Sequence, residues 1–185
     1  MIKDLLADTE QRMKKTLDAM DDDFKTIRTG RASPALVERV MVMYYGAPTP
    51  LQQLAVISAP EPQMLLIRPY DPSSIRDIEK GIQQAELGLN PNNDGRLVRI
   101  PIPRLTEERR LELVKVVKRR VEDAKVALRN IRRDALEDMR EYENEKLISE
   151  DDRKRGQDEL QELTDKHVEM VDKAGERKEN DIMEI

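Results

Sequence analysis

Three stretches of the chain repeat apolar residues at alternating spacings of three and four, the period of one face of an α-helix. The stripe in residues 2–28 consists of Ile2, Leu6, Thr9, Met13, Thr16, Met20, Phe24 and Ile27, supported by Leu5 and Leu17. A second, after Thr106, consists of Val114, Val117, Val121, Ala124, Leu128, Ile131 and Ala135. The third, after Ser149, consists of Leu160, Leu163, His167, Met170 or Val171, and Ala174. A single amphipathic helix cannot bury its stripe alone, so the pattern predicts a three-helix bundle.

The expected helix ends have recognisable signals. Gly30 follows the first stripe and suits a left-handed stop. Thr106 precedes Glu107 and Glu108, a typical helix start, and no Gly or Pro follows before Gly156. The second helix is therefore expected to run about forty residues, roughly 60 Å at 1.5 Å per residue. Ser149, followed by acidic residues, is predicted to cap the third helix.

Residues 31–105 have a different character, with all ten prolines and short runs rich in Val and Ile. Strands are predicted at 39–45, 54–59, 64–69 and 97–102, and Ser33-Pro34 is expected to open a short helical turn. Residues 46–50 and 92–95 are interpreted as turns. Ser73 or Ser74 is expected to cap a helix to about Ala85, with Ile75, Ile78 and Ile82 on one face. This is a small mixed α/β domain.

Together these elements predict an α+β protein. Residues 1–30 and 105–185 would form a long antiparallel three-helix bundle, and residues 31–104 a small β/α/β domain inserted into it. Two short crossings containing Gly and Pro join the two parts, and they are predicted hinges near 29–32 and 101–106. The hinge residues are Thr29, Gly30, Arg31, Ala32, Pro101, Ile102, Pro103, Arg104 and Leu105.

Composition narrows the class of protein. There is no Cys, which excludes disulfides and thiolate chemistry, and only 3% of residues are aromatic, which suits long helices better than a bulky core. No apolar run approaches the length of a membrane span, and the N-terminal residues do not resemble a signal peptide. We expect a monomeric cytoplasmic protein with no membrane partner.

Charge is unevenly distributed along the chain, although the net charge is only −5. Residues 109–133 contain ten basic and three acidic residues, whereas residues 134–185 contain nineteen acidic and nine basic ones. Clustered basic residues on one helix face predict a nucleic-acid contact, and the candidates are Lys118, Lys125, Arg129, Arg132 and Arg133. With no aromatic residues interleaved, a structured RNA is favoured over a single strand. The alternative is a solvated face with salt bridges to the acidic third helix, which would suit Arg119 and Arg120.

Catalytic chemistry is disfavoured. His167 is the single histidine and lies on a helix seam, and no phosphate-binding glycine loop is present. Asn90, Asn92 and Asp94 imitate the start of a calcium loop, but position twelve is Pro101 instead of a glutamate, so a turn is the better interpretation. No metal or cofactor is expected. Two rival functions remain open: a coiled-coil adaptor or chaperone, and a hydrolase using acidic residues of the small domain.

Six segments resemble those of the ribosome recycling factor family, over essentially the full length and in the right order. They are Arg28–Pro34 (RTGRASP), Tyr44–Pro50 (YYGAPTP), Leu87–Asn92 (LGLNPN), Leu105–Arg110 (LTEERR), Arg129–Asp134 (RNIRRD) and Ile148–Asp152 (ISEDD).

The resemblance implies an L-shaped protein that binds the ribosome after termination. With elongation factor G and GTP, it would split the subunits for another round of initiation. It also implies that the bundle contacts large-subunit ribosomal RNA through Arg132 above all, with Arg129, Arg133, Arg28 and Arg31 nearby. Because the chain has no phosphate loop, GTP hydrolysis would belong to the partner.

Overall fold

The computed structural model describes residues 1–184, which form two compact units. One unit comprises Met1–Phe24 and Arg110–Ile185, and the other comprises Lys25–Arg109. The segments predicted as hinges, 29–32 and 101–106, both fall inside the second unit.

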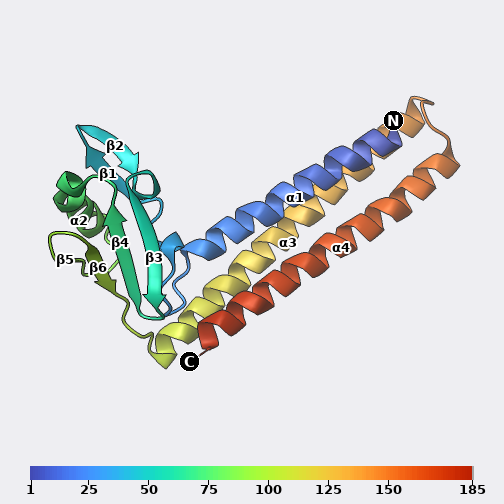
Figure 1. Cartoon of the computed structure of the whole chain (residues 1–185). Helices are drawn as coiled ribbons and strands as arrows, with labels where there is room; N and C mark the ends of the chain where they lie inside the picture. Colours follow the sequence, from blue (N-terminus) through green and yellow to red (C-terminus); the bar gives the residue numbers. More distant parts are fainter. Residues whose placement is uncertain (185) are drawn as a thin grey trace. The chain divides into compact units, whose positions relative to one another are not determined.

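The first unit is built from three long helices, α1 (Ile2–Thr26), α3 (Glu107–Asn144) and α4 (Glu150–Met183), as Figure 1 shows. Two glycines of α4 mark where the helices approach each other closely. A Cβ atom at Gly156 would lie 3.1 Å from Ile2 of α1 and 3.3 Å from the sulfur of Met139 of α3. At Gly175 it would lie 2.5 Å from Val121 of α3. The residue numbers rise from Gly156 to Gly175 along α4, while those of the facing residues fall from Met139 to Val121 along α3. The two helices are therefore antiparallel.

The apolar stripes form the core of the bundle, which confirms the bundle prediction. The buried seam residues include Met13, Met20 and Phe24 of α1, Val117, Ala124, Leu128, Ile131 and Ala135 of α3, and Leu160, His167, Val171 and Ala174 of α4.

At three places, a neighbour of the predicted seam residue is the buried one. Leu17 is buried where Thr16 was expected, Leu113 where Val114 was, and Thr164 where Leu163 was. A straight helix has 3.6 residues per turn, so a strict three-four alternation drifts off the buried face. Thr164 tolerates burial because its hydroxyl donates to the carbonyl oxygen of Leu160 at 2.7 Å.

The predicted starts of α3 and α4 are confirmed by their caps. Thr106 Oγ1 accepts a hydrogen bond from the N–H of Arg109 at 3.1 Å. Ser149 and Asp152 form a reciprocal capping box, in which Ser149 Oγ accepts from the Asp152 N–H and Asp152 Oδ2 accepts from the Ser149 N–H. The first helix ends at Thr26, earlier than the stop expected at Gly30, although Gly30 does adopt the left-handed conformation with a φ of +77°.

The second unit contains a hairpin and a four-stranded antiparallel sheet. Strands β1 (Met41–Tyr44) and β2 (Ala47–Pro50) form the hairpin. The sheet has the order β3-β4-β6-β5, from β3 (Ala55–Glu61), β4 (Met64–Pro69), β6 (Val98–Pro101) and β5 (Asn92–Asn93). Helix α2 (Ile75–Gln84) contacts β1, and short 3-10 turns span Pro34–Leu36, Leu51–Gln53 and Pro72–Ser74.

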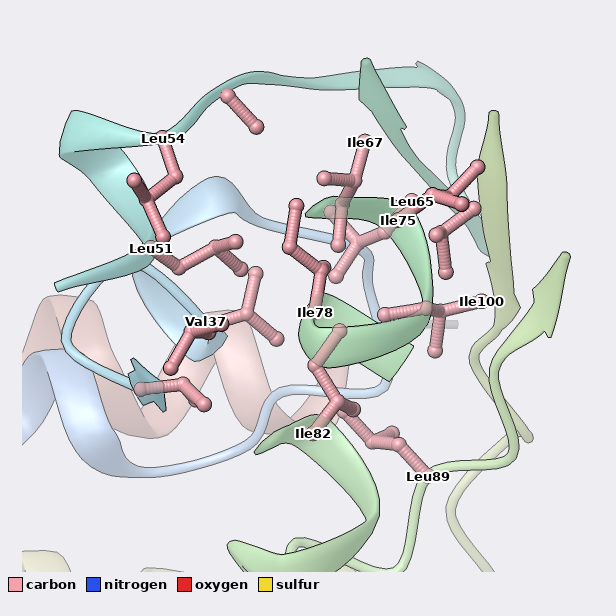
Figure 2. Packing of buried hydrophobic residues seen from close by; sticks show 14 of the residues in the cluster. Val37, Leu51, Leu54, Leu65, Ile67, Ile75, Ile78, Ile82, Leu89 and Ile100 are labelled. Carbon is pink, nitrogen blue, oxygen red and sulfur yellow. The ribbon is translucent and has the colours of Figure 1, made fainter. Parts of the chain in front are cut away.

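One apolar cluster holds the second unit together (Figure 2). Ile75, Ile78 and Ile82 of α2 are all buried, as their spacing predicted. Val98 and Ile100 of β6 are fully buried while Arg99 between them is exposed, which is the alternation of a strand with one covered face.

Two local predictions for this unit are wrong. Residues 46–50 are not simply a turn: Ala47–Pro50 is strand β2, and the turn is made by Tyr45 and Gly46 with φ values of +49° and +78°. Two prolines fit in β2 because it pairs with β1 alone and so has an unpaired edge. Asn92 and Asn93, interpreted as part of a second turn, form strand β5. The N-cap of α2 is Ser74, one of the two expected residues, but its side chain makes no capping hydrogen bond. Asp71 instead caps the preceding 3-10 turn by accepting from the Ser73 N–H.

Candidate nucleic-acid interface

The basic candidates on α3 lie along a single helix whose opposite side is locked into the bundle. Residues 118, 125, 129, 132 and 133 span fifteen positions, about 22 Å at 1.5 Å per residue. Leu128 and Ile131, which alternate with the basic residues, are buried. The packed seam therefore holds this face of α3 in place, and the cations need no reorganisation of the backbone to meet a ligand.

The hydrogen-bond partners of these cations distinguish them. Lys125 Nζ lies 2.5 Å from Asp172 Oδ1 of α4 and is only 25% exposed. Arg129 Nη2 contacts Glu122 Oε1 at 3.0 Å on the same helix.

Arg133 donates to Asn130 Oδ1 at 2.7 Å. In contrast, neither Arg132 nor Lys118 has an ion pair or hydrogen-bond partner for its side chain within residues 1–184.

The acidic helix α4 neutralises part of this face, but not through the residues expected. Arg120 pairs with Asp23 of α1 at 3.5 Å instead of with α4, and Arg119 has no ion pair in the described part of the chain. The α4 partner that sequence reasoning missed is Asp172. The antiparallel packing of α3 and α4 could have indicated Asp172, because it places each α3 position opposite an α4 position of the same seam.

Arg28 and Arg31 belong to the second unit, whereas the other candidates belong to α3 in the first. Arg28 Nη2 donates to the carbonyl oxygen of Pro103 at 3.0 Å, and so joins the residue just before the first predicted hinge to the second hinge. Arg31 is exposed. The structure brings together the five candidates on α3, and these two arginines belong to the other unit.

Several predicted hinge residues are tied to the turn between β3 and β4. The Ala32 N–H donates to the carbonyl of Pro62 at 2.6 Å, and the Ile102 N–H donates to that of Gln63 at 2.8 Å. Ile102 is 2% exposed within the second unit's core, and Pro101 belongs to β6. Gly30 packs against Leu105, with 3.5 Å between its ideal Cβ position and the Leu105 Cγ.

The remaining candidate chemistry of residues 1–184 concerns metal ligands, a membrane span and the single histidine. No group of three or more metal-ligating side chains occurs there, and no helix is long and apolar enough to cross a membrane. His167 is 1% exposed, with its Nδ1 at 2.8 Å from the Leu163 carbonyl oxygen, as a packed seam residue should be. The N–H groups of Leu97 and Arg96 lower the pKa of Asp94, whose carboxylate forms a turn, as predicted.

Known proteins match the chain along its whole length. The family model described as ribosome recycling factor matches residues 20–183. Ribosome-recycling factors of Syntrophomonas wolfei and Roseiflexus castenholzii are 54% and 56% identical over 185 residues, which is 100% of this chain and of each relative.

Two solved structures are similar as well. A solution structure of the ribosome recycling factor has a TM-score of 0.82 and 42% identity, and covers 100% of this chain and 98% of that one. The other comes from models for the T. thermophilus ribosome recycling factor and the E. coli elongation factor G bound to the E. coli post-termination complex. Its TM-score is 0.68 with 42% identity, and it covers 99% of both chains. On this full-length similarity, the chain belongs to the ribosome recycling factor family.

Proposed function

We propose that this protein binds the post-termination ribosome and, with elongation factor G and GTP, promotes its dissociation into subunits and its release from mRNA. The observation that carries this proposal is the identity of more than half of all residues with relatives named ribosome-recycling factor, over their entire length. The second structural neighbour, which is bound with elongation factor G to a post-termination complex, supports the same partners.

The face of α3 that carries Arg132 is the proposed contact with large-subunit ribosomal RNA. Arg132 has no partner within residues 1–184, so it does not have to break an internal ion pair before it binds phosphate. An arginine can bind phosphate with two parallel hydrogen bonds. Lys118, Arg129, Arg133 and Lys125 would add charge around it, and Arg28 and Arg31 would act from the second unit.

The remaining parts of the proposal concern the domains. The bundle of residues 1–30 and 105–185 would dock on RNA, and the domain of residues 31–104 would swing about residues 29–32 and 101–106. Gly30, in the left-handed conformation, and the prolines at 101 and 103 support these positions. The protein would act in the cytoplasm as a monomer and not as an enzyme, with GTP hydrolysed by elongation factor G.

The decisive test measures subunit splitting of post-termination ribosomes by elongation factor G and GTP, with and without this protein. We expect splitting to require the protein. If splitting proceeds equally without it, the proposed function is wrong.

The RNA contact is tested by binding of large subunits at several salt concentrations. Arg132→Ala removes a charge-assisted contact of about 1.5–3 kcal/mol, so affinity should fall roughly tenfold or more. The salt slope should decrease by about 0.7–0.9. Arg119→Ala is the matched control, because it removes the same charge from α3 at a position about 140° around the helix axis from Arg132. Equal effects of the two substitutions would refute the assignment of Arg132.

The hinge is tested separately by interdomain residual dipolar couplings, in the free protein and with large subunits bound. We expect more than one orientation of the two units. A single orientation in both samples would exclude the hinge.

A further inference from the structure

Helix α4 presents two acidic residues in equivalent positions toward α3, but only one of them forms an ion pair across the helices. Lys125 of α3 pairs with Asp172 of α4 at 2.5 Å. Arg132 lies seven residues after Lys125, and Asp165 lies seven residues before Asp172. In packed antiparallel helices, a step of seven in opposite directions brings two residues to the same relation one heptad along the seam. Arg132 and Asp165 therefore repeat the arrangement of Lys125 and Asp172.

The burial of the four side chains supports this equivalence. Lys125 and Arg132 are both half-buried on α3, and Asp172 and Asp165 are both exposed on α4. The buried contacts on either side keep the antiparallel register to within one residue between them, since Gly175 faces Val121 and Gly156 faces Met139.

What differs is the neighbour of the carboxylate. Gln161, one turn earlier on α4, donates from Nε2 to Asp165 Oδ1 at 2.8 Å. The corresponding residue before Asp172 is Val168, whose side chain has no hydrogen-bond donor. Asp172 is therefore available to Lys125, whereas Asp165 is held along its own helix, and Arg132 has no ion pair among residues 1–184.

We propose that Gln161 is a positioning residue: by holding the Asp165 carboxylate along α4, it leaves the Arg132 guanidinium free to bind RNA phosphate. The role of Gln161 in RNA binding rests on the proposed function, whereas its effect on pairing between Arg132 and Asp165 is a property of the free protein. Without Gln161, Asp165 would act as an internal competitor of phosphate, as Asp172 does for Lys125.

The first measurement is made on the free protein and does not involve the ribosome. In Gln161→Ala, which keeps a good helix former at an exposed position, the Nε–H NMR signal of Arg132 should shift and exchange more slowly, because an ion pair forms with Asp165. The signal should return to its original position in Gln161→Ala/Asp165→Asn. Gln157→Ala is the matched control, since the Gln157 Oε1 also makes a hydrogen bond over one turn of α4, which it accepts from Arg153 Nη1. It should leave the Arg132 signal unchanged.

The second measurement is the affinity for large ribosomal subunits. Exposed ion pairs are modest, so Gln161→Ala should weaken binding by about two- to fivefold at low salt. The added Asp165→Asn change should restore it, which a purely structural role of Gln161 would not allow.

The possible failures are distinguishable. An unchanged Arg132 signal in Gln161→Ala would overturn the positioning role, even if Arg132→Ala abolishes binding. A shifted signal with unchanged affinity in both Gln161→Ala and Arg132→Ala would instead overturn the proposed RNA contact.

Discussion

The close approach of α4 to α3 at Gly175 can be tested by adding one methyl group. A Cβ atom at this position would lie 2.5 Å from Cγ2 of Val121, whereas carbon atoms in contact prefer about 3.5–4.0 Å. Val121 or the helix must therefore move by about 1 Å. Overpacking of this kind costs about 1–3 kcal/mol. The same substitution gains about 1 kcal/mol because alanine is the better helix former, so the two effects must be separated.

Gly156 on the same helix provides the separation. Gly156→Ala gains the same helix propensity, but its Cβ would meet Ile2, at the start of α1, and the flexible thioether of Met139 at 3.1–3.3 Å. We expect Gly175→Ala to be less stable than Gly156→Ala by about 1–3 kcal/mol in urea unfolding followed by helical circular dichroism. Val121→Ala in the Gly175→Ala background should recover most of the loss through coupling between the two sites. Equal stability of the two glycine variants, or coupling below about 0.5 kcal/mol, would refute this account of the packing.

Three further predictions address the caps and the second core. Ile78→Ala should destabilise the second unit by about 2–5 kcal/mol, because Ile78 is fully buried. The methyl NMR signals of the second unit should lose their dispersion, while the helical circular dichroism signal of the bundle persists. The exposed Val56→Ala is the control. Ser149→Ala should cost the bundle about 1 kcal/mol in urea unfolding, and Ser149→Asp should retain most of the cap. Hydrogen bonds from Ser73 and then Tyr44 lower the pKa of Asp71 below its ordinary value of 3.8. The stabilisation from the Asp71 carboxylate is therefore complete above that value and is lost as pH falls through the lower folded pKa. In Asp71→Asn, the stability of the second unit, measured by NMR, should depend less on pH in the acid range.

The buried seam shows how much of the core can be predicted from the spacing of apolar residues. The spacing of apolar residues identified the three helices and most of the core, because an isolated amphipathic helix must bury its stripe. It did not distinguish Leu163 from Thr164, since adjacent positions differ by 100° and the orientation of each helix is chosen by its neighbours. Similarly, a Gly-Ala-Pro-Thr-Pro run has the composition of a turn, and became strand β2 because β1 offered a partner.

The sequence alone determined the helices, the N-caps of α3 and α4, the mixed character of residues 31–105, the basic composition of α3 and the family resemblance. These depend on neighbours within a few positions along the chain, or on segments that can be recognised one by one. Only the tertiary structure decided which cations are already paired. The Lys125–Asp172 ion pair and the hydrogen bond that occupies Asp165 depend on the packing register of α3 against α4 and on side-chain geometry. The free guanidinium of Arg132 is a consequence of that packing, and sequence spacing alone does not specify it.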